Sequence, residues 1–259
     1  MKKDLFLCSF SKDALKIIKN NKIGMESNHF CISCNLDDEN FDDTIAVVRR
    51  DMEFCEIDDV SRLFIHGPFT EIYPQAIDPK AVRMGLDRLE DAYRGCRELR
   101  AARMVVHSGF LPIMYFDEWH VKKSIEFWTE YMKDKPDDFN IYIENVFDPN
   151  PEPLVEIVKG ISDPRVKLCL DVGHANAVTE DKDVYQWIKI MGEHIGHFHI
   201  HNNDGSGDQH NEITNGTLDM ELVLRCIDDY CKEDVTLTVE SRESSDSIPW
   251  ILEKLSGER

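Results

Sequence analysis

Short apolar segments alternate with longer amphipathic stretches from one end of the chain to the other, and this alternation limits the possible folds more than any other feature. Several of the segments are apolar almost throughout, which is typical of strands buried on both faces of a parallel sheet. The predicted strands are residues 5–10, 24–28, 62–66, 104–107, 140–144, 166–171, 195–200 and 235–240.

Helical patterns fill the intervals between these strands. The clearest covers residues 79–99, and residues 219–230 and 244–255 are similar, with an Asp and a Ser near their starts as candidate caps. A strand followed by a helix, repeated around a closed sheet, predicts an α/β fold of the (β/α)8 TIM-barrel class, whose members run to about 250 residues. We therefore expect residues 1–259 to form a single TIM-barrel domain.

A doubly wound open sheet is the main alternative fold. Such a sheet usually carries a glycine-rich turn after its first strand, because the backbone there approaches a phosphate group closely. Residues 10–13 of this chain read Phe-Ser-Lys-Asp and contain no glycine. The barrel is therefore the favoured architecture.

Composition narrows the function classes. Apolar residues make up 42% of the chain, enough for a sizeable core, and the 30 basic and 50 acidic residues give a net charge of −20. This excess of negative charge disfavours nucleic acid as a partner. No apolar run approaches the length of a signal-peptide core or of a membrane span of about 20 residues, so we expect a soluble, cytoplasmic protein.

The eight cysteines are scattered, and in a cytoplasmic protein we expect reduced thiols. The pair Cys31-Ile-Ser-Cys34 has the spacing of a redox pair or of half a zinc site. A second pair at zinc-ribbon spacing is missing, which favours reduced thiols over a redox pair or a zinc site.

Six successive predicted strands end on a side chain that can ligate a metal. Each alone could be a core histidine or a helix cap, but the carboxyl ends of barrel strands converge on one axis. Several unpaired charges there would be costly unless a cation offset them. The six predicted ligands are His66, His107, Glu144, Asp171, His199 and Glu240.

Three further candidate ligands, His174, Asp208 and His210, lie just beyond the strands. Five histidines and four carboxylates suit zinc, manganese or iron better than magnesium or calcium. His197, His199 and His201 alternate and should share one face of their strand. For His194 and Asp204 we favour an ordinary surface position.

The chain resembles the xylose isomerase-like TIM-barrel superfamily, which includes sugar and sugar-phosphate isomerases and epimerases and also endonuclease IV. The resemblance is sharpest at residues 170–176, Leu-Asp-Val-Gly-His-Ala-Asn, and at residues 199–205, His-Ile-His-Asn-Asn-Asp-Gly, followed by Asp-Gln-His at 208–210. Two departures are visible. The family often has Asp at the position of Asn202, and residues 214–216, Thr-Asn-Gly, keep only the second glycine of a common Gly-x-Gly.

The resemblance implies a ligand set. In the simpler isomerases one metal would be held by the residues that match Glu144, Asp171, His199 and Glu240. In endonuclease IV a three-zinc cluster adds the positions that match His66, His107, His174, Asp208 and His210. The resemblance thus implies two or three divalent ions, with zinc expected first and manganese or iron as alternatives.

Two enzymatic functions fit such a site. The first is a metal-dependent sugar or sugar-phosphate isomerase or epimerase, in which a metal polarises a carbonyl while Glu144 and Glu240 remove and return a proton. The alternative is an apurinic/apyrimidinic endonuclease of the endonuclease IV type, a zinc phosphodiester hydrolase, which nine ligands suit well. A barrel that binds metal without catalysis is a third hypothesis.

The loops expected to rim the site favour the isomerase. Residues 67–78 and 202–216 contain acidic residues and no Lys or Arg, so a nucleic acid would be repelled. Aromatic residues there could pack on a sugar ring or form the interface of a homo-oligomer. These aromatic residues are Phe69, Tyr73, Phe110, Tyr115, Phe116, Trp119 and Phe147. We therefore expect a small, neutral or weakly charged carbohydrate substrate.

Overall fold

The computed structural model describes residues 3–180 and 183–256, and in it eight parallel strands close into a barrel. The strands follow one another around the barrel in sequence order, and β1 pairs with β8 to close it. The predicted (β/α)8 fold is thus confirmed. The strands are β1 (Leu5–Cys8), β2 (Gly24–Ser27), β3 (Leu63–His66), β4 (Arg103–His107), β5 (Asn140–Glu144), β6 (Val166–Asp171), β7 (Ile195–Ile200) and β8 (Thr236–Val239).

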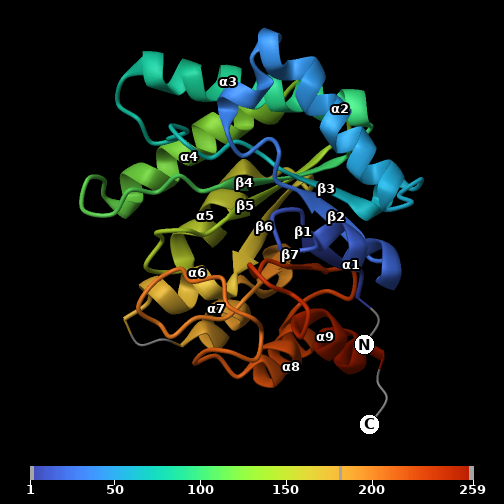
Figure 1. The fold of residues 1–259 in the computed structure, drawn as a ribbon. Helices are drawn as coiled ribbons and strands as arrows, with labels where there is room; N and C mark the ends of the chain where they lie inside the picture. The colour runs from blue at the N-terminus through green and yellow to red at the C-terminus, as the bar shows by residue number, and fades with distance from the viewer. Residues whose placement is uncertain (1–2, 181–182, 257–259) are drawn as a thin grey trace.

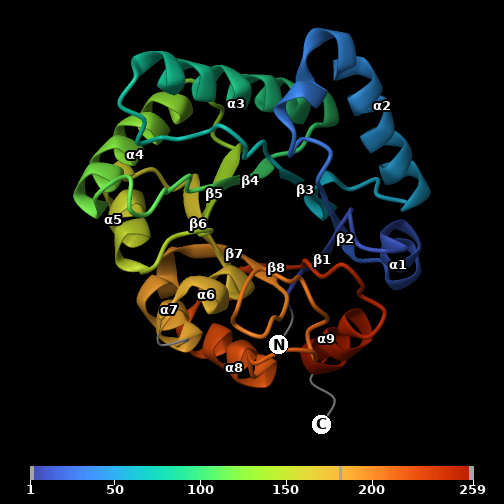
Figure 2. The same ribbon diagram turned by 60° about the vertical axis from the view of Figure 1, so that its left-hand side comes forward.

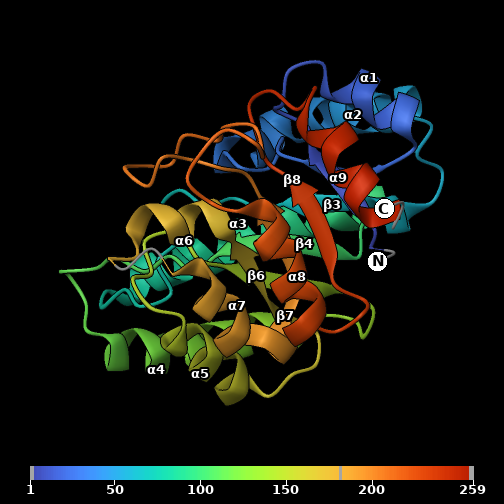
Figure 3. The same cartoon turned by 90° about the horizontal axis from the view of Figure 1, so that it is seen from below.

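Helices surround the strands as an outer ring (Figure 1, Figure 2). One α-helix follows each strand except β6, which is followed by two, and α7 and α8 lie side by side (Figure 3). The α-helices are α1 (Ala14–Asn21), α2 (Asp38–Phe54), α3 (Pro79–Leu99), α4 (Asp117–Met132), α5 (Glu152–Ile161), α6 (Val172–Val178), α7 (Val184–Met191), α8 (Met220–Tyr230) and α9 (Ser247–Ser256). Short 3-10 turns are η1 (Ser33–Leu36), η2 (Val60–Arg62) and η3 (Gly192–His194).

Predicted and observed boundaries agree closely where capping is clear. Helix α3 covers the predicted residues 79–99, and α8 begins after Asp219, whose carboxylate accepts a hydrogen bond from the backbone N–H of Leu222 at 3.0 Å. Helix α9 begins at Ser247, three residues after the predicted start. None of the helices in the described ranges is long and apolar enough to cross a membrane.

Two layers of apolar side chains stabilise the barrel. The larger core lies between strands and helices, while Phe6, Phe64, Val105, Tyr142 and Cys169 form a separate cluster within the barrel. The Phe6 and Phe64 rings meet edge to face, with centroids 5.0 Å apart. The interior is therefore filled, as in other barrels of this class.

The strand register sets the predicted ligands side by side at one mouth of the barrel. His107 is paired with Glu144 across β4 and β5, and Asp171 with His199 across β6 and β7. Because neighbouring strands are about 4.8 Å apart, paired residues of this kind lie within reach of one ion. The site is thus positioned by the sheet itself.

Phe64→Ala tests the interior cluster. We expect it to lower the free energy of unfolding by about 3–5 kcal/mol, because a buried phenyl ring is lost and a cavity remains. The ring also stacks on His197 at a centroid distance of 4.1 Å, so the loss should loosen the floor of the site. Urea unfolding measures the effect, and the exposed Phe116→Ala is the control. Equal stability of the two variants would contradict a filled interior.

Candidate metal centre

The nine predicted ligands, joined by His201, gather at the C-terminal mouth of the strands in three adjoining clusters. Within each cluster, the ligand atoms all lie within 4.8 Å of one another. Metal ligation by these residues stays a prediction, although the structure brings them together. The first cluster is His66, His107 and Glu144, the central cluster is Glu144, Asp171, His199 and Glu240, and the third is His174, His201, Asp208 and His210.

Glu144, at the end of β5, is shared by the first and central clusters and is fully buried. Its Oε1 lies 3.2 Å from Nδ1 of His199, and its Oε2 lies 3.4 Å from Nε2 of His66 and 3.4 Å from Nε2 of His107. Burial by itself would raise the pKa of Glu144, but the neighbouring imidazoles outweigh it and hold that pKa well below its usual range. The carboxylate is therefore kept ionised between two groups of histidines.

Backbone carbonyls orient three of the histidines. In each case Nδ1 of the ring is placed to donate to a carbonyl oxygen, so that in the neutral ring Nε2 is the unprotonated nitrogen and faces its cluster. This tautomer is the one a metal requires at Nε2. The pairs are His66 with Gly67 at 3.0 Å, His174 with Asn145 at 2.9 Å and His210 with Glu240 at 2.6 Å.

A carboxylate that the sequence analysis missed orients His199. Oε1 of Glu26, on β2, lies 3.0 Å from Nε2 of His199, so that Nδ1 faces the central cluster. Thr238 donates to the other oxygen of Glu26 at 2.6 Å. Glu26 is fully buried in β2, where an ionised carboxylate needs partners such as these imidazoles and this hydroxyl group.

His197 lies beneath the clusters and is held by two threonine hydroxyl groups. Its Nδ1 lies 2.6 Å from Oγ1 of Thr236, and its Nε2 lies 2.9 Å from Oγ1 of Thr238. Burial lowers the pKa of His197 to about 4. It is a neutral, hydrogen-bonded core histidine beneath the site.

Several buried polar atoms at the mouth have no hydrogen-bond partner in the part of the chain that is described. Leaving such atoms unsatisfied costs about 1–3 kcal/mol each, and more for charged groups. A divalent cation at the centre of each cluster would satisfy them, and the mixed imidazole and carboxylate donors fit zinc, manganese or iron. The atoms are Oε1 and Oε2 of Glu144, Oδ2 of Asp171, Nδ1 of His199, and Nδ1 and Nε2 of His201.

A pocket of about 590 Å³ opens above the clusters. Its walls are largely aromatic and aliphatic, and no Lys or Arg is among the described residues that line it. Phe69, Tyr73, Phe110 and Phe147 line it as predicted, together with Phe10. Tyr115, Phe116 and Trp119 do not line this pocket: Tyr115 and Phe116 lie in the loop after β4, and Trp119 lies in α4 beside a separate surface pocket.

The loop between β7 and α8 carries Asp208 and His210, and Asn202 holds it in place. The Asn202 amide donates to the carbonyls of Ile213 at 2.8 Å and Leu218 at 3.1 Å. Aspartate could not donate these bonds, which explains why asparagine suits this position. A Cβ atom at Gly216 would lie 2.1 Å from Oδ1 of Asn202, so glycine is needed there.

Buried polar contacts join two other loops at the mouth. The Gln75 amide donates to the carbonyl of Gly109 at 2.5 Å, and the Trp119 indole donates to the carbonyl of Gln75 at 2.9 Å. Nδ1 of His120 lies 3.3 Å from Oε1 of Gln75. These contacts fix the wall of the pocket beside Phe110.

The fold and the site define a class of protein, a TIM barrel with a histidine- and carboxylate-rich mouth. The sequence profile of the family described as xylose isomerase-like TIM barrel matches residues 54–256, and the chain belongs to this family. The uncharacterized protein MJ1311 of Methanocaldococcus jannaschii is 26% identical over 72% of this chain. The alignments with MJ1311 and with a second protein of that organism, MJ1614, span 66% and 61% of those proteins.

Solved structures share the fold over nearly the whole chain. The TTHB071 protein of Thermus thermophilus, soaked with ZnCl2, is 23% identical with a TM-score of 0.76, and 99% of each chain is covered. A D-tagatose 3-epimerase-like protein is 22% identical with a TM-score of 0.74, covering 99% of this chain and 97% of its own. At this level of identity the likeness establishes the fold.

Removing the buried imidazole of His120 should make the free energy of unfolding less sensitive to acid. Burial lowers the pKa of His120 to about 4, below the value of about 6.5 expected for the unfolded chain. As pH falls through this window, the unfolded chain takes up a proton that the folded chain refuses, so stability is lost. Between pH 7 and pH 4, we expect the free energy of unfolding of His120→Gln to fall by up to about 3 kcal/mol less than that of the wild type. Parallel losses in urea unfolding would contradict this.

Proposed function

We propose that the protein is a divalent-metal-dependent isomerase or epimerase that transfers a proton beside the carbonyl of a carbohydrate. The main support is that two residues of the central cluster, Glu144 and Glu240, line the pocket. The other two, Asp171 and His199, lie beneath it. Two carboxylates that face the substrate space from separate strands suit acid–base work. A bound cation would polarise the carbonyl and acidify the neighbouring C–H bond.

Glu144 and Glu240 differ in the number of histidines that they contact. Glu144 turns one oxygen to His199 and the other to His66 and His107. Glu240 turns Oε2 to Nδ1 of His199 at 3.1 Å. Since Glu144 is shared between two clusters, we assign removal of the proton to Glu240 and its return to Glu144.

The pocket lining supports a neutral substrate. A phosphorylated sugar would call for Lys, Arg or convergent backbone donors, and the described lining residues include neither Lys nor Arg. Phe69 and Phe147 offer flat apolar surfaces on the wall. Such surfaces can pack on the apolar face of a sugar ring, while the hydroxyl groups face the carboxylates.

A phosphodiester hydrolase is the second candidate, and the third cluster is the observation that favours it. A simple isomerase needs only the central ligands, whereas this chain adds His174, Asp208 and His210. The acidic, cation-poor pocket speaks against it, because DNA binders contact phosphates through Lys, Arg and backbone N–H groups.

One assay with two arms separates these functions. Zinc- or manganese-loaded protein is incubated with unphosphorylated ketoses in deuterium oxide and, separately, with a duplex that contains an abasic site. We expect deuterium at the carbon beside the carbonyl, detected by proton NMR, and an intact duplex. Cleavage of the duplex with no exchange in any ketose would overturn the proposal.

Glu240→Gln tests the proton-transfer role. We expect exchange to fall about 10²- to 10⁴-fold, which is the usual contribution of a general base. Glu243→Gln is the matched control, since Glu243 makes the same change three residues along the chain and pairs with Lys12 on the surface. Metal content is measured for both variants. Wild-type exchange in a metal-loaded Glu240→Gln protein would contradict the assignment.

A further inference from the structure

We propose that His201 is the fourth protein ligand of the third cluster, so that this cluster is a closed zinc site that anchors a loop and does not activate substrate. His201 directly follows β7 and is fully buried. The three other members, His174, Asp208 and His210, line the pocket, whereas His201 lies beneath them. This inference does not depend on which reaction the protein catalyses.

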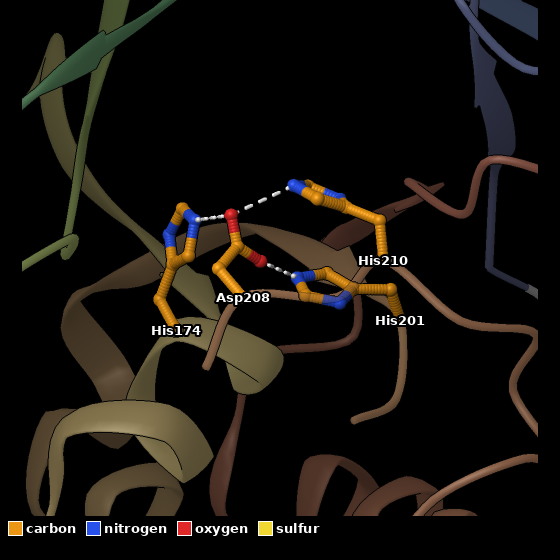
Figure 4. Close-up of side chains that lie close together, drawn as sticks. All are labelled: His174, His201, Asp208 and His210. Carbon is orange, nitrogen blue, oxygen red and sulfur yellow. Dashed lines mark ion pairs between the residues drawn. The ribbon is translucent and has the colours of Figure 1, made fainter. Parts of the chain in front are cut away.

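The distances in the third cluster match a tetrahedral ion. Three imidazole Nε2 atoms surround the Asp208 carboxylate, at 2.9 Å for His210, 3.3 Å for His174 and 3.6 Å for His201 (Figure 4). Ligand atoms about 2.0–2.1 Å from a tetrahedral zinc ion lie about 3.3–3.4 Å from one another. The four side chains thus need only small adjustments to enclose an ion.

The two ring nitrogens of His201 make no hydrogen bond of good geometry within the described residues, although both are buried. The ring stacks on that of His210, with centroids 4.2 Å apart and an interplanar angle of 22°. Stacking holds the ring with Nε2 between two carboxylates, 3.1 Å from Oδ1 of Asp171 and 3.6 Å from Oδ1 of Asp208, and a metal would satisfy that nitrogen.

The sequence makes room for this ring. A Cβ atom on Gly173 would lie 2.0 Å from Cε1 of His201, so any larger residue there would displace the imidazole. Gly173 directly precedes His174 on α6, so both residues contribute to the third cluster. His174 would ligate the ion, and the missing side chain of Gly173 leaves room for the His201 ring.

Ligand number decides what the ion can do. A tetrahedral zinc ion with four protein ligands is usually structural, whereas an ion that acts on substrate keeps a position open for it. The central cluster also offers four ligands, but three of them are carboxylates, which suit an ion such as manganese that takes up to six ligands and so keeps positions open. The third cluster joins α6, the end of β7 and the loop that carries Asp208 and His210. A closed ion would cross-link these segments and leave chemistry to the other two clusters.

A competing role for His201 is to orient Asp171, whose Oδ1 lies 3.1 Å from Nε2 of His201. The two roles predict the loss of different ions. Asp208→Asn removes a ligand of the third cluster alone and serves as the reference. If His201 is a ligand, His201→Ala loses the same metal equivalent as Asp208→Asn, and the double variant loses no more. A further equivalent lost in the double variant would overturn the proposal.

The experiment measures bound zinc per chain by mass spectrometry and zinc affinity by competition with a chromophoric chelator. We expect His201→Ala to weaken the third equivalent by more than about 100-fold, the upper end for loss of an outer hydrogen-bond partner. Gly173→Ala should weaken the same equivalent, and the effects should not add. His120→Gln, which removes a buried histidine outside the clusters, should keep wild-type zinc content.

Cobalt substitution tests the geometry without relying on the fold of a His201 variant. The difference between wild-type and Asp208→Asn cobalt spectra isolates the third ion. A four-coordinate tetrahedral ion gives intense visible bands, whereas five- or six-coordinate ions give weak ones. We expect intense bands that vanish in His201→Ala and return with added imidazole. Weak bands, or an Asp208→Asn protein that loses no metal, would overturn the proposal.

Discussion

The site depends on one constraint, the desolvation of carboxylates and imidazoles that meet at the C-terminal mouth of an apolar barrel. Glu144 and Asp171 are fully buried, and both carry oxygens without a hydrogen-bond partner among the described residues. In water such groups would be solvated, and in the barrel only opposite charge can compensate for that loss. Imidazoles supply part of this compensation, and divalent cations would supply the rest.

The barrel supports this arrangement from below as well as from its rim. Phe64 provides a flat surface for His197, which shares Glu26 with His199. Glu26 in turn sets which nitrogen of His199 faces the central cluster. Orientation of a ligand by its neighbours matters because loss of such an outer partner typically lowers metal affinity by about 10- to 100-fold. The interior is therefore both a hydrophobic core and a scaffold for the ligands.

Much of this could be predicted from the sequence. Strand-end residues such as His66 and Glu144 stood out because an ionisable group at the end of an apolar run has few simple explanations. Glu26 lies in the middle of its strand, where the search for strand-end ligands did not look. His201 was predicted to share a face with His199, but its approach to Asp208 depends on how the loop folds back through Asn202. Loop geometry of this kind follows from long-range hydrogen bonds and not from local periodicity.

The aromatic residues of the rim were likewise only partly predictable from the sequence. Phe69 and Phe147 lie in the pocket, but Trp119 donates its indole N–H to Gln75 and faces another part of the surface. Their positions just after a strand end predicted that these residues lie near the mouth, but did not predict which way their side chains point. The proposed substrate class therefore rests on the described residues that reach the pocket, chiefly Glu144 and Glu240, and on the absence of Lys and Arg among them.

The most direct measurement of the central claim is anomalous diffraction at the zinc edge from crystals of protein loaded with zinc. The account predicts a peak among Glu144, Asp171, His199 and Glu240, about 2.0–2.2 Å from their donor atoms. It also predicts that Glu26 keeps its contact with His199 in the loaded protein. Crystals in excess zinc that show no peak there, with these side chains turned away from a shared centre, would contradict it.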